Sequence, residues 1–173
     1  FIYDKKFEIG DIVNNLLIDV IKSKNYIVGS TNKRYVRFTT DEINKLTYYN
    51  KKSYGWSLKE SFLFEFVLLP VRNTILFKSV ISPCDEDYDR DRLREIVTGI
   101  DGSNPGLGKK WSSNHSVNYK FNFELIDEKS EEELTNELSL IVEDVDGIVK
   151  KYEKQFLNHK DELLEMKSFS IQP

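Results

Sequence analysis

The residue types in this sequence with the clearest chemical potential are basic and aromatic side chains in three separate segments. They are Arg34, Arg37, Trp56, Lys109, Lys110 and Trp111. Lys and Arg neutralise phosphate groups, and indole rings stack on nucleobases, so the combination is typical of a nucleic-acid surface. If the three segments meet on one face, they form a basic patch that binds DNA or RNA. The structural alternative is solvated charge scattered over the surface.

Other motifs resemble catalytic or metal sites but lack necessary parts. The loop 102–110 ends in Gly-Lys-Lys, but Ser103 replaces the first Gly of a phosphate-binding loop and Lys110 replaces its Ser or Thr. Glu65 and Lys78 resemble the acid and lysine of metal-dependent nucleases, without the further carboxylate that holds the metal. The acids of residues 85–91 lack the central Gly and terminal Glu of a calcium loop. We therefore predict no metal site, no cofactor and no catalytic residues.

Histidine and cysteine add little to this list. His115 and His159 are the only histidines and belong to different elements, so we predict two surface histidines and no catalytic base. Cys84 is the only cysteine, which excludes an internal disulfide and a thiolate zinc site.

The element that must position any site is a hairpin formed by residues 62–81. Two strand-like runs flank a four-residue turn, and both faces of the first run are largely apolar. Closing this turn places Glu65 opposite Lys78, and Phe66 opposite Phe77. A hairpin that is apolar on both faces should lie in the centre of a sheet, with each face at least partly covered.

Further segments have the periodicity of a helix or a strand. They are an amphipathic helix at 9–21, a turn at 29–33, a strand at 34–38, a short Thr-capped helix from 41, a helix after the acidic turn at 82–87 that stops at Gly99, and a strand at 117–126. Hairpin-joined strands with grouped helices predict an α+β fold with a mostly antiparallel sheet of about four strands.

The residue pattern of the C-terminal part predicts a single long helix. Residues 130–133 form a capping box, and apolar residues follow at helical spacing to the region of Phe156. A helix unbroken to Met166 would be about 50 Å long, so either it bends at Asp146-Gly147 or its end projects toward a partner. Polar residues near its end favour projection. We expect an α+β domain at 1–129, the helix at 130–167 and a tail at 168–173.

Composition limits the classes of function. The chain has 173 residues and a net charge of −4, which excludes a uniformly basic nucleic-acid binder but not a local basic face. No apolar run approaches the roughly 18 residues of a membrane span, and no signal peptide is visible, so we expect a soluble cytoplasmic protein without membrane contact. The chain begins with Phe1 instead of Met, so a piece of a longer protein is one interpretation of the sequence.

A family resemblance adds a second line of argument. The resemblance rests on these segments, in chain order: Arg34 to Phe38 before TTDEI, Gly55-Trp56, the strands FLFEFVLL and TILFKSVIS, Lys109-Lys110-Trp111 before VNYKFNFEL, and a Glu-rich long helix. This order resembles the C-terminal region of bacterial PD-(D/E)XK nuclease superfamily proteins, many of which are linked to phage defence. The resemblance covers about residues 30–157. The catalytic residues of that family lie in an N-terminal domain with no matching segment here, so no catalytic residue is carried over.

Two functions follow as expectations. The first is a non-catalytic module of a nuclease-like protein that positions nucleic acid next to an upstream nuclease domain. The second is a protein-interaction or oligomerisation module, which predicts a homodimer and an exposed seam on the long helix at Leu138, Ile141, Val145, Ile148 and Tyr152. The acidic composition favours the second, whereas the resemblance favours the first.

Overall fold

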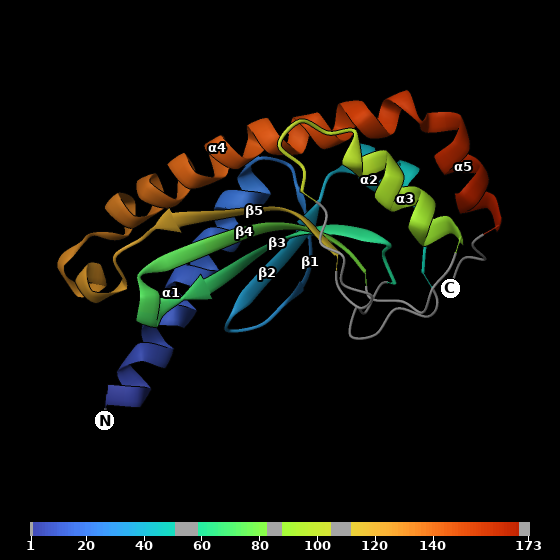
Figure 1. Ribbon diagram of the computed structural model, residues 1–173. Coiled ribbons are helices and arrows are strands. Elements are labelled where there is room, and N and C mark those ends of the chain that lie inside the picture. Colours follow the sequence, from blue (N-terminus) through green and yellow to red (C-terminus); the bar gives the residue numbers. More distant parts are fainter. Residues whose placement is uncertain (1, 51–58, 83–87, 105–111, 170–173) are drawn as a thin grey trace.

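Five antiparallel strands form one sheet, and two long helices lie across one of its faces. The computed structural model describes residues 2–50, 59–82, 88–104 and 112–169. The elements are α1 (Ile2–Ser23), β1 (Ile27–Thr31), β2 (Tyr35–Thr39), α2 (Asp41–Leu46), β3 (Phe62–Leu69), η1 (Pro70–Arg72), β4 (Thr74–Ile81), α3 (Tyr88–Thr98), β5 (Ser112–Lys120), η2 (Phe123–Glu128), α4 (Glu131–Asn158) and α5 (Lys160–Phe169). Figure 1 shows α4 running along one side of the sheet. The predicted α+β class is confirmed, with five strands instead of about four.

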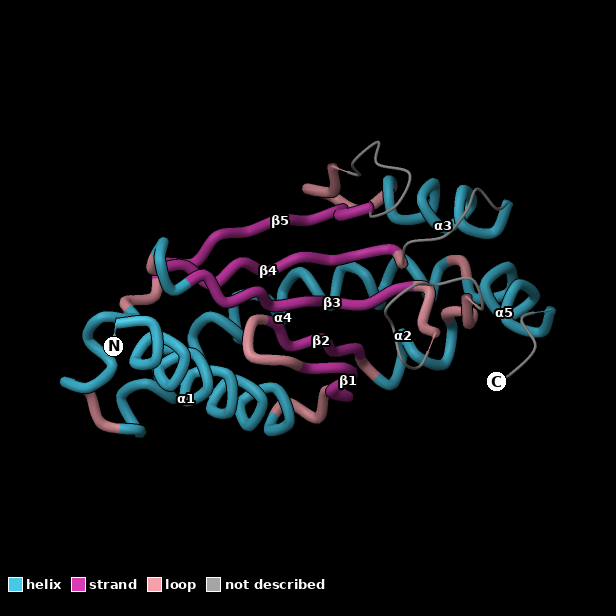
Figure 2. Tube along the Cα trace, turned by 90° about the horizontal axis from the view of Figure 1, so that it is seen from below, coloured by secondary structure: helices cyan, strands magenta, loops and turns pink. Residues whose placement is uncertain are grey.

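The central hairpin has the predicted register. Glu65 lies opposite Lys78, and Phe66 lies opposite Phe77. The turn between the strands is the short η1 helix, and it ends at Asn73 in a left-handed conformation with φ 44°. The sheet order β1-β2-β3-β4-β5 puts this hairpin in the middle, as its apolar faces require. Figure 2 shows the strands side by side in this order, with α4 behind them.

Strand β1 corrects the predicted turn at 29–33. Val28 pairs with Phe38 and packs against the core, so the backbone stays extended through Gly29 to Thr31. The turn is shorter and is held by Asn32, whose side-chain oxygen accepts hydrogen bonds from the backbone N–H groups of Arg34 and Tyr35 at 2.8 and 2.9 Å. An Asn side chain that bonds the backbone two residues on is a common turn device.

Strand β5 begins earlier and ends earlier than predicted. It covers Ser112–Lys120, whereas the alternating sequence predicts a strand at 117–126. The strand stops because Asn73 takes over the backbone bonds: its carbonyl accepts from Phe121 N at 3.0 Å, and its side-chain oxygen accepts from Phe123 N at 3.0 Å. Phe121 and Phe123 are both buried, which turns the chain into η2 and ends the pleat.

The core lies between the sheet and the two long helices. Phe62 and Phe64 from β3 contact the ring of Tyr152 on α4, with centroid distances of 5.1 and 5.4 Å. Phe38 stacks on Tyr26 at 5.3 Å and contacts the neighbouring strand rings. Aromatic pairs at these separations add about 0.5–1.5 kcal/mol each to the burial of their area.

The long helix continues without a break through Gly147, and its end does not project. Helix α4 runs for 28 residues from the predicted capping box of Ser130 and Glu133, and it ends at Asn158. The chain turns at His159, and α5 folds back so that Lys167 Nζ donates to the carbonyl oxygen of Asn44 in α2 at 2.6 Å. The reversal buries Leu163 and Met166, and that burial is the physical reason that the predicted single helix is wrong.

Candidate functional site

The charged residues of the five strands share the face of the sheet that points away from α4, called here the far face. They are Arg37, Glu65, Lys78 and Lys120, three bases and one acid. Arg37, Glu65, Lys78 and Ser116 lie in one row across β2 to β5, because directly paired residues of antiparallel strands point to the same side. The two core rings that flank Glu65 point the other way, toward the helices.

Arg37 is not the exposed phosphate ligand that the sequence predicts. Its guanidinium Nε lies 2.8 Å from Glu65 Oε2, its Nη1 donates to Ser30 Oγ at 3.2 Å, and only 7% of the residue is exposed. Lys78 Nζ lies 3.4 Å from the other Glu65 oxygen. Burial raises the pKa of the nearby Glu60 carboxyl, and the charge of Arg37 opposes that shift. Arg37 therefore belongs to a buried ion-pair network that positions Glu65 and Lys78.

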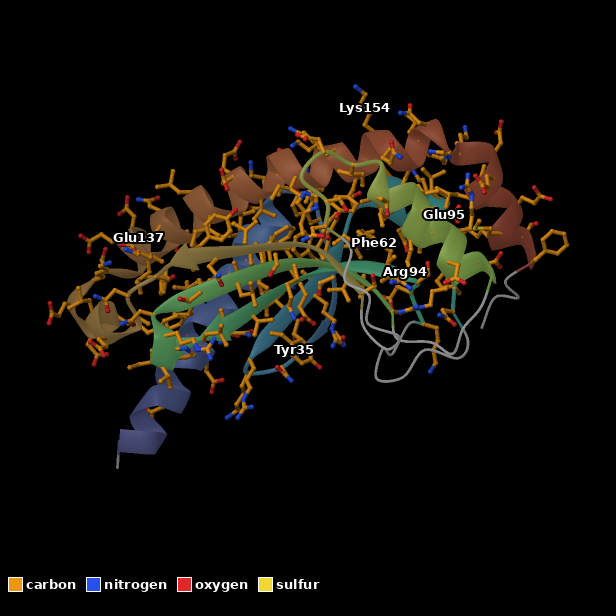
Figure 3. All side chains as sticks on the ribbon, in the orientation of Figure 1. Tyr35, Phe62, Arg94, Glu95, Glu137 and Lys154 are labelled. Atoms are coloured by element: carbon orange, nitrogen blue, oxygen red, sulfur yellow. The ribbon has the colours of Figure 1, made fainter. Side chains whose placement is uncertain are left out.

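The next row of the far face is mainly apolar and half-buried. Tyr35 is paired with Val67, Val67 with Leu76, and Leu76 with Asn118. The Arg37 guanidinium carbon lies 4.2 Å from the centroid of the Tyr35 ring, a cation–π contact that fixes the ring beside the charged row. Figure 3 shows Tyr35 on the side of the sheet away from α4.

Three exposed basic residues lie at the hairpin end of the sheet. The Arg34 carbonyl accepts from Leu68 N, Lys120 pairs with Thr74, and Arg72 is in the η1 turn between β3 and β4. Within the part of the chain that the structure describes, Arg34, Arg72 and Lys120 form no ion pair. No carboxylate among the described residues therefore neutralises their charges.

The structure does not test the predicted convergence of three segments, because its two described members, Arg34 and Arg37, belong to one segment. Trp56, Lys109, Lys110 and Trp111 lie outside the described residues. The residues that border their segments, Asn50, Lys59, Asn104 and Ser112, belong to the opposite end of the sheet from Arg34. Asn50 donates to Ser82 Oγ, and Ser112 pairs with Ile81, at the far ends of β4 and β5 from the hairpin turn.

The seam proposed for oligomerisation is not exposed. Leu138, Val145 and Tyr152 have 0% exposure, Ile141 has 8%, and Ile148 packs partly buried against the core. These apolar residues form the face of α4 that covers its own sheet, so this face is not available to a second copy. Of the described residues of α4, Leu140 and Leu157 are its exposed large apolar side chains.

A buried polar cluster was missed by the sequence reasoning. The Tyr152 hydroxyl lies 2.6 Å from both Ser79 Oγ and His115 Nδ1, and His115 N donates to Ser79 Oγ at 2.9 Å. The register of β4 and β5 shifts between Lys78 and Val80, and this irregularity lets the backbone N–H of His115 reach Ser79. Burial lowers the pKa of His115 and raises that of Tyr152, so both are neutral near pH 7.

His115 is therefore wrongly predicted as a surface residue, since it is 8% exposed. One signal was present in the sequence: His115, Val117 and Tyr119 alternate, and both of the latter face the core. The polar run of residues 112–116 hid this extension of the strand. Because Tyr152 is fully buried, the cluster joins α4 to the sheet and offers no entry to a substrate.

Helix α4 carries the opposite charge balance to the strands. Helix α4 contains eight acidic residues and three lysines. Figure 3 labels one residue of each kind on its outer side, Glu137 and Lys154. In a chain with net charge −4, helix α4 is thus acidic, whereas the exposed charged residues of the sheet are basic.

The described residues contain neither a metal-binding cluster nor a membrane-spanning helix. Those residues contain no group of three or more His, Cys, Asp or Glu side chains that could hold a metal ion. Their helices also include none with the length and apolar character needed to cross a membrane.

Comparison with protein-family models, with curated proteins and with solved structures finds no match. The resemblance to PD-(D/E)XK nuclease proteins thus stays a prediction, and any function must be argued from the geometry.

Proposed function

We propose that this chain is a non-catalytic module that positions nucleic acid on the far face of its sheet. The observation that supports this most is the separation of charge between the layers: the exposed charged residues on the sheet are basic, whereas α4 is strongly acidic. A polyanion is attracted to the basic sheet surface and repelled by the acidic helix, so it is oriented on the protein without a catalysed reaction. The predicted nuclease resemblance agrees with an accessory role of this kind.

The residues that would contact phosphate are Arg34, Lys78 and Lys120. Arg34 and Lys120 are exposed and form no ion pair with a described residue, and the Lys78 side chain is 27% exposed beside Glu65. Arg37 acts indirectly, because its pairing with Glu65 leaves that carboxylate less able to neutralise Lys78.

Fluorescence anisotropy with a labelled oligonucleotide tests this proposal. Three phosphate contacts predict binding that is roughly 15- to 40-fold weaker at about 200 mM salt than at about 50 mM. The triple variant Arg34→Gln, Lys78→Gln, Lys120→Gln should lose most of this binding. Lys154→Gln on the outer side of α4 is the matched control and should bind like the unchanged chain.

Two results would contradict the proposal. One is the absence of binding at low salt by a chain whose circular dichroism shows it folded. The other is an equal loss of affinity in the triple variant and in Lys154→Gln, because the charge would then act without regard to face.

A further inference from the structure

We infer that the far face binds single-stranded nucleic acid with its bases unstacked, in preference to a duplex. This inference rests on the proposed function and names its substrate class. It follows from the order of the rows on the sheet, in which an apolar row lies between two sets of cations.

The apolar row is formed by Tyr35, Val67 and Leu76, which are all partly exposed. Lys78 lies two residues along β4 from Leu76 on one side, and Lys120, opposite Thr74, lies two residues away on the other. At about 3.3 Å per residue, the two cationic levels are about 13 Å apart with the apolar row midway. Phosphates can thus contact the lysines while bases lie over the middle row.

A duplex cannot use this arrangement. Its bases are stacked inside the helix, so it would present phosphates or solvated groove edges to Tyr35, Val67 and Leu76. Covering apolar side chains with charged groups removes those groups from water without a partner, which is unfavourable. A single strand turns its bases outward, and each base has a flat apolar surface that can stack on a ring.

Tyr35 is the ring best placed to accept a base. It is held on one side by the Arg37 guanidinium at 4.2 Å, and Arg37 is itself fixed by Glu65. A ring fixed before binding loses little conformational freedom when a base stacks on it. Asn118, at the end of the same row, adds an exposed amide that can bond to a base edge. Stacking of this kind tolerates any base, so weak sequence preference is expected.

The test compares fluorescein-labelled single-stranded and hairpin-duplex DNA of about 12 nucleotides or base pairs, within the size range of single-strand sites. We expect tighter binding of the single strand. Tyr35→Leu should weaken it by at least about five-fold, the loss of one stacked base, and leave the salt dependence unchanged. Lys120→Gln should do the reverse and lower the slope of log affinity against log salt by about 0.7.

A second variant keeps the test decisive if Tyr35→Leu unfolds. In Tyr35→Trp, single-stranded DNA should quench the fluorescence of the added indole, measured as the difference from the unchanged chain. Duplex binding as tight as single-strand binding, or an added indole that stays unquenched in a saturated complex, would overturn this inference and leave the proposed function standing. Binding of neither probe would overturn the proposed function itself.

Discussion

Replacing Tyr152 by Phe removes one hydroxyl from a buried polar contact between α4 and the sheet. That oxygen lies 2.6 Å from Ser79 Oγ and 2.6 Å from His115 Nδ1, and Tyr152 has 0% exposure. The backbone of Asp101 hydrogen-bonds the same imidazole. The geometry therefore assigns that bond to Nε2–H, so that Nδ1 accepts from the Tyr152 hydroxyl.

The loss of stability depends on which hydrogen bonds Ser79 and His115 keep in the variant. Two hydrogen bonds are lost, at about 1 kcal/mol each. Ser79 Oγ still accepts from His115 N at 2.9 Å, so it is not left without a partner. His115 Nδ1 is left unsatisfied, at a further cost of about 1–3 kcal/mol. The free energy of unfolding should fall by about 3–5 kcal/mol, or roughly 6–20 °C in Tm.

Urea unfolding followed by circular dichroism measures this change. Tyr119→Phe is the matched control, because its hydroxyl donates to Asp144 at 2.5 Å in an exposed position and should cost no more than about 1 kcal/mol. Equal effects in the two variants, or a change below about 0.5 kcal/mol for Tyr152→Phe, would refute the role given to this cluster.

Three further predictions concern the same two networks. Because burial lowers the pKa of His115, the unfolded chain binds this proton more readily; stability should therefore fall as pH decreases below about 6.5, and His115→Gln should remove that step from pH-dependent urea midpoints. Glu65→Gln removes the carboxylate that pairs with the buried Arg37 guanidinium and should cost about 3 kcal/mol, measured by urea unfolding, while the pair Arg37→Met with Glu65→Leu should cost less than the single change. Gly102→Ala should lower Tm, because Gly102 has φ +79° and an added Cβ would lie 3.2 Å from His115 Nε2; an unchanged Tm in a calorimetric scan would contradict that geometry.

The parts of the fold that depend on neighbouring residues are predictable from the sequence. The register of Glu65 with Lys78 follows from a short turn, and the caps at Thr40 and Ser130 bond only to residues three positions on. Strand β1 is different, because Gly29 is strand-like only when β2 lies beside it. The fold-back at His159 likewise depends on α2, more than a hundred residues earlier in the chain.

The candidate site could likewise be predicted from the sequence only in part. The row that contains Arg37 can be derived from alternation, but its burial depends on Glu65, 28 residues away on another strand. An arginine in a short strand has the same sequence pattern whether it binds phosphate or a carboxylate. His115 needed both the β5 irregularity and the position of Tyr152, 37 residues away, before its environment could be recognised.

The order of the sheet has a consequence for how the chain is completed during synthesis. Each strand pairs with the next one along the chain, so all five can assemble by local steps as they leave the ribosome. The aromatic rings that face α4 are covered later, because α4 follows the last strand in the chain. The hydrogen bond from Tyr26 to Asp146 of α4 spans 120 residues. Until residue 156 has emerged, Phe62 and Phe64 lack the rings that cover them. The nascent sheet therefore passes through a stage with an exposed aromatic surface, when aggregation competes with folding.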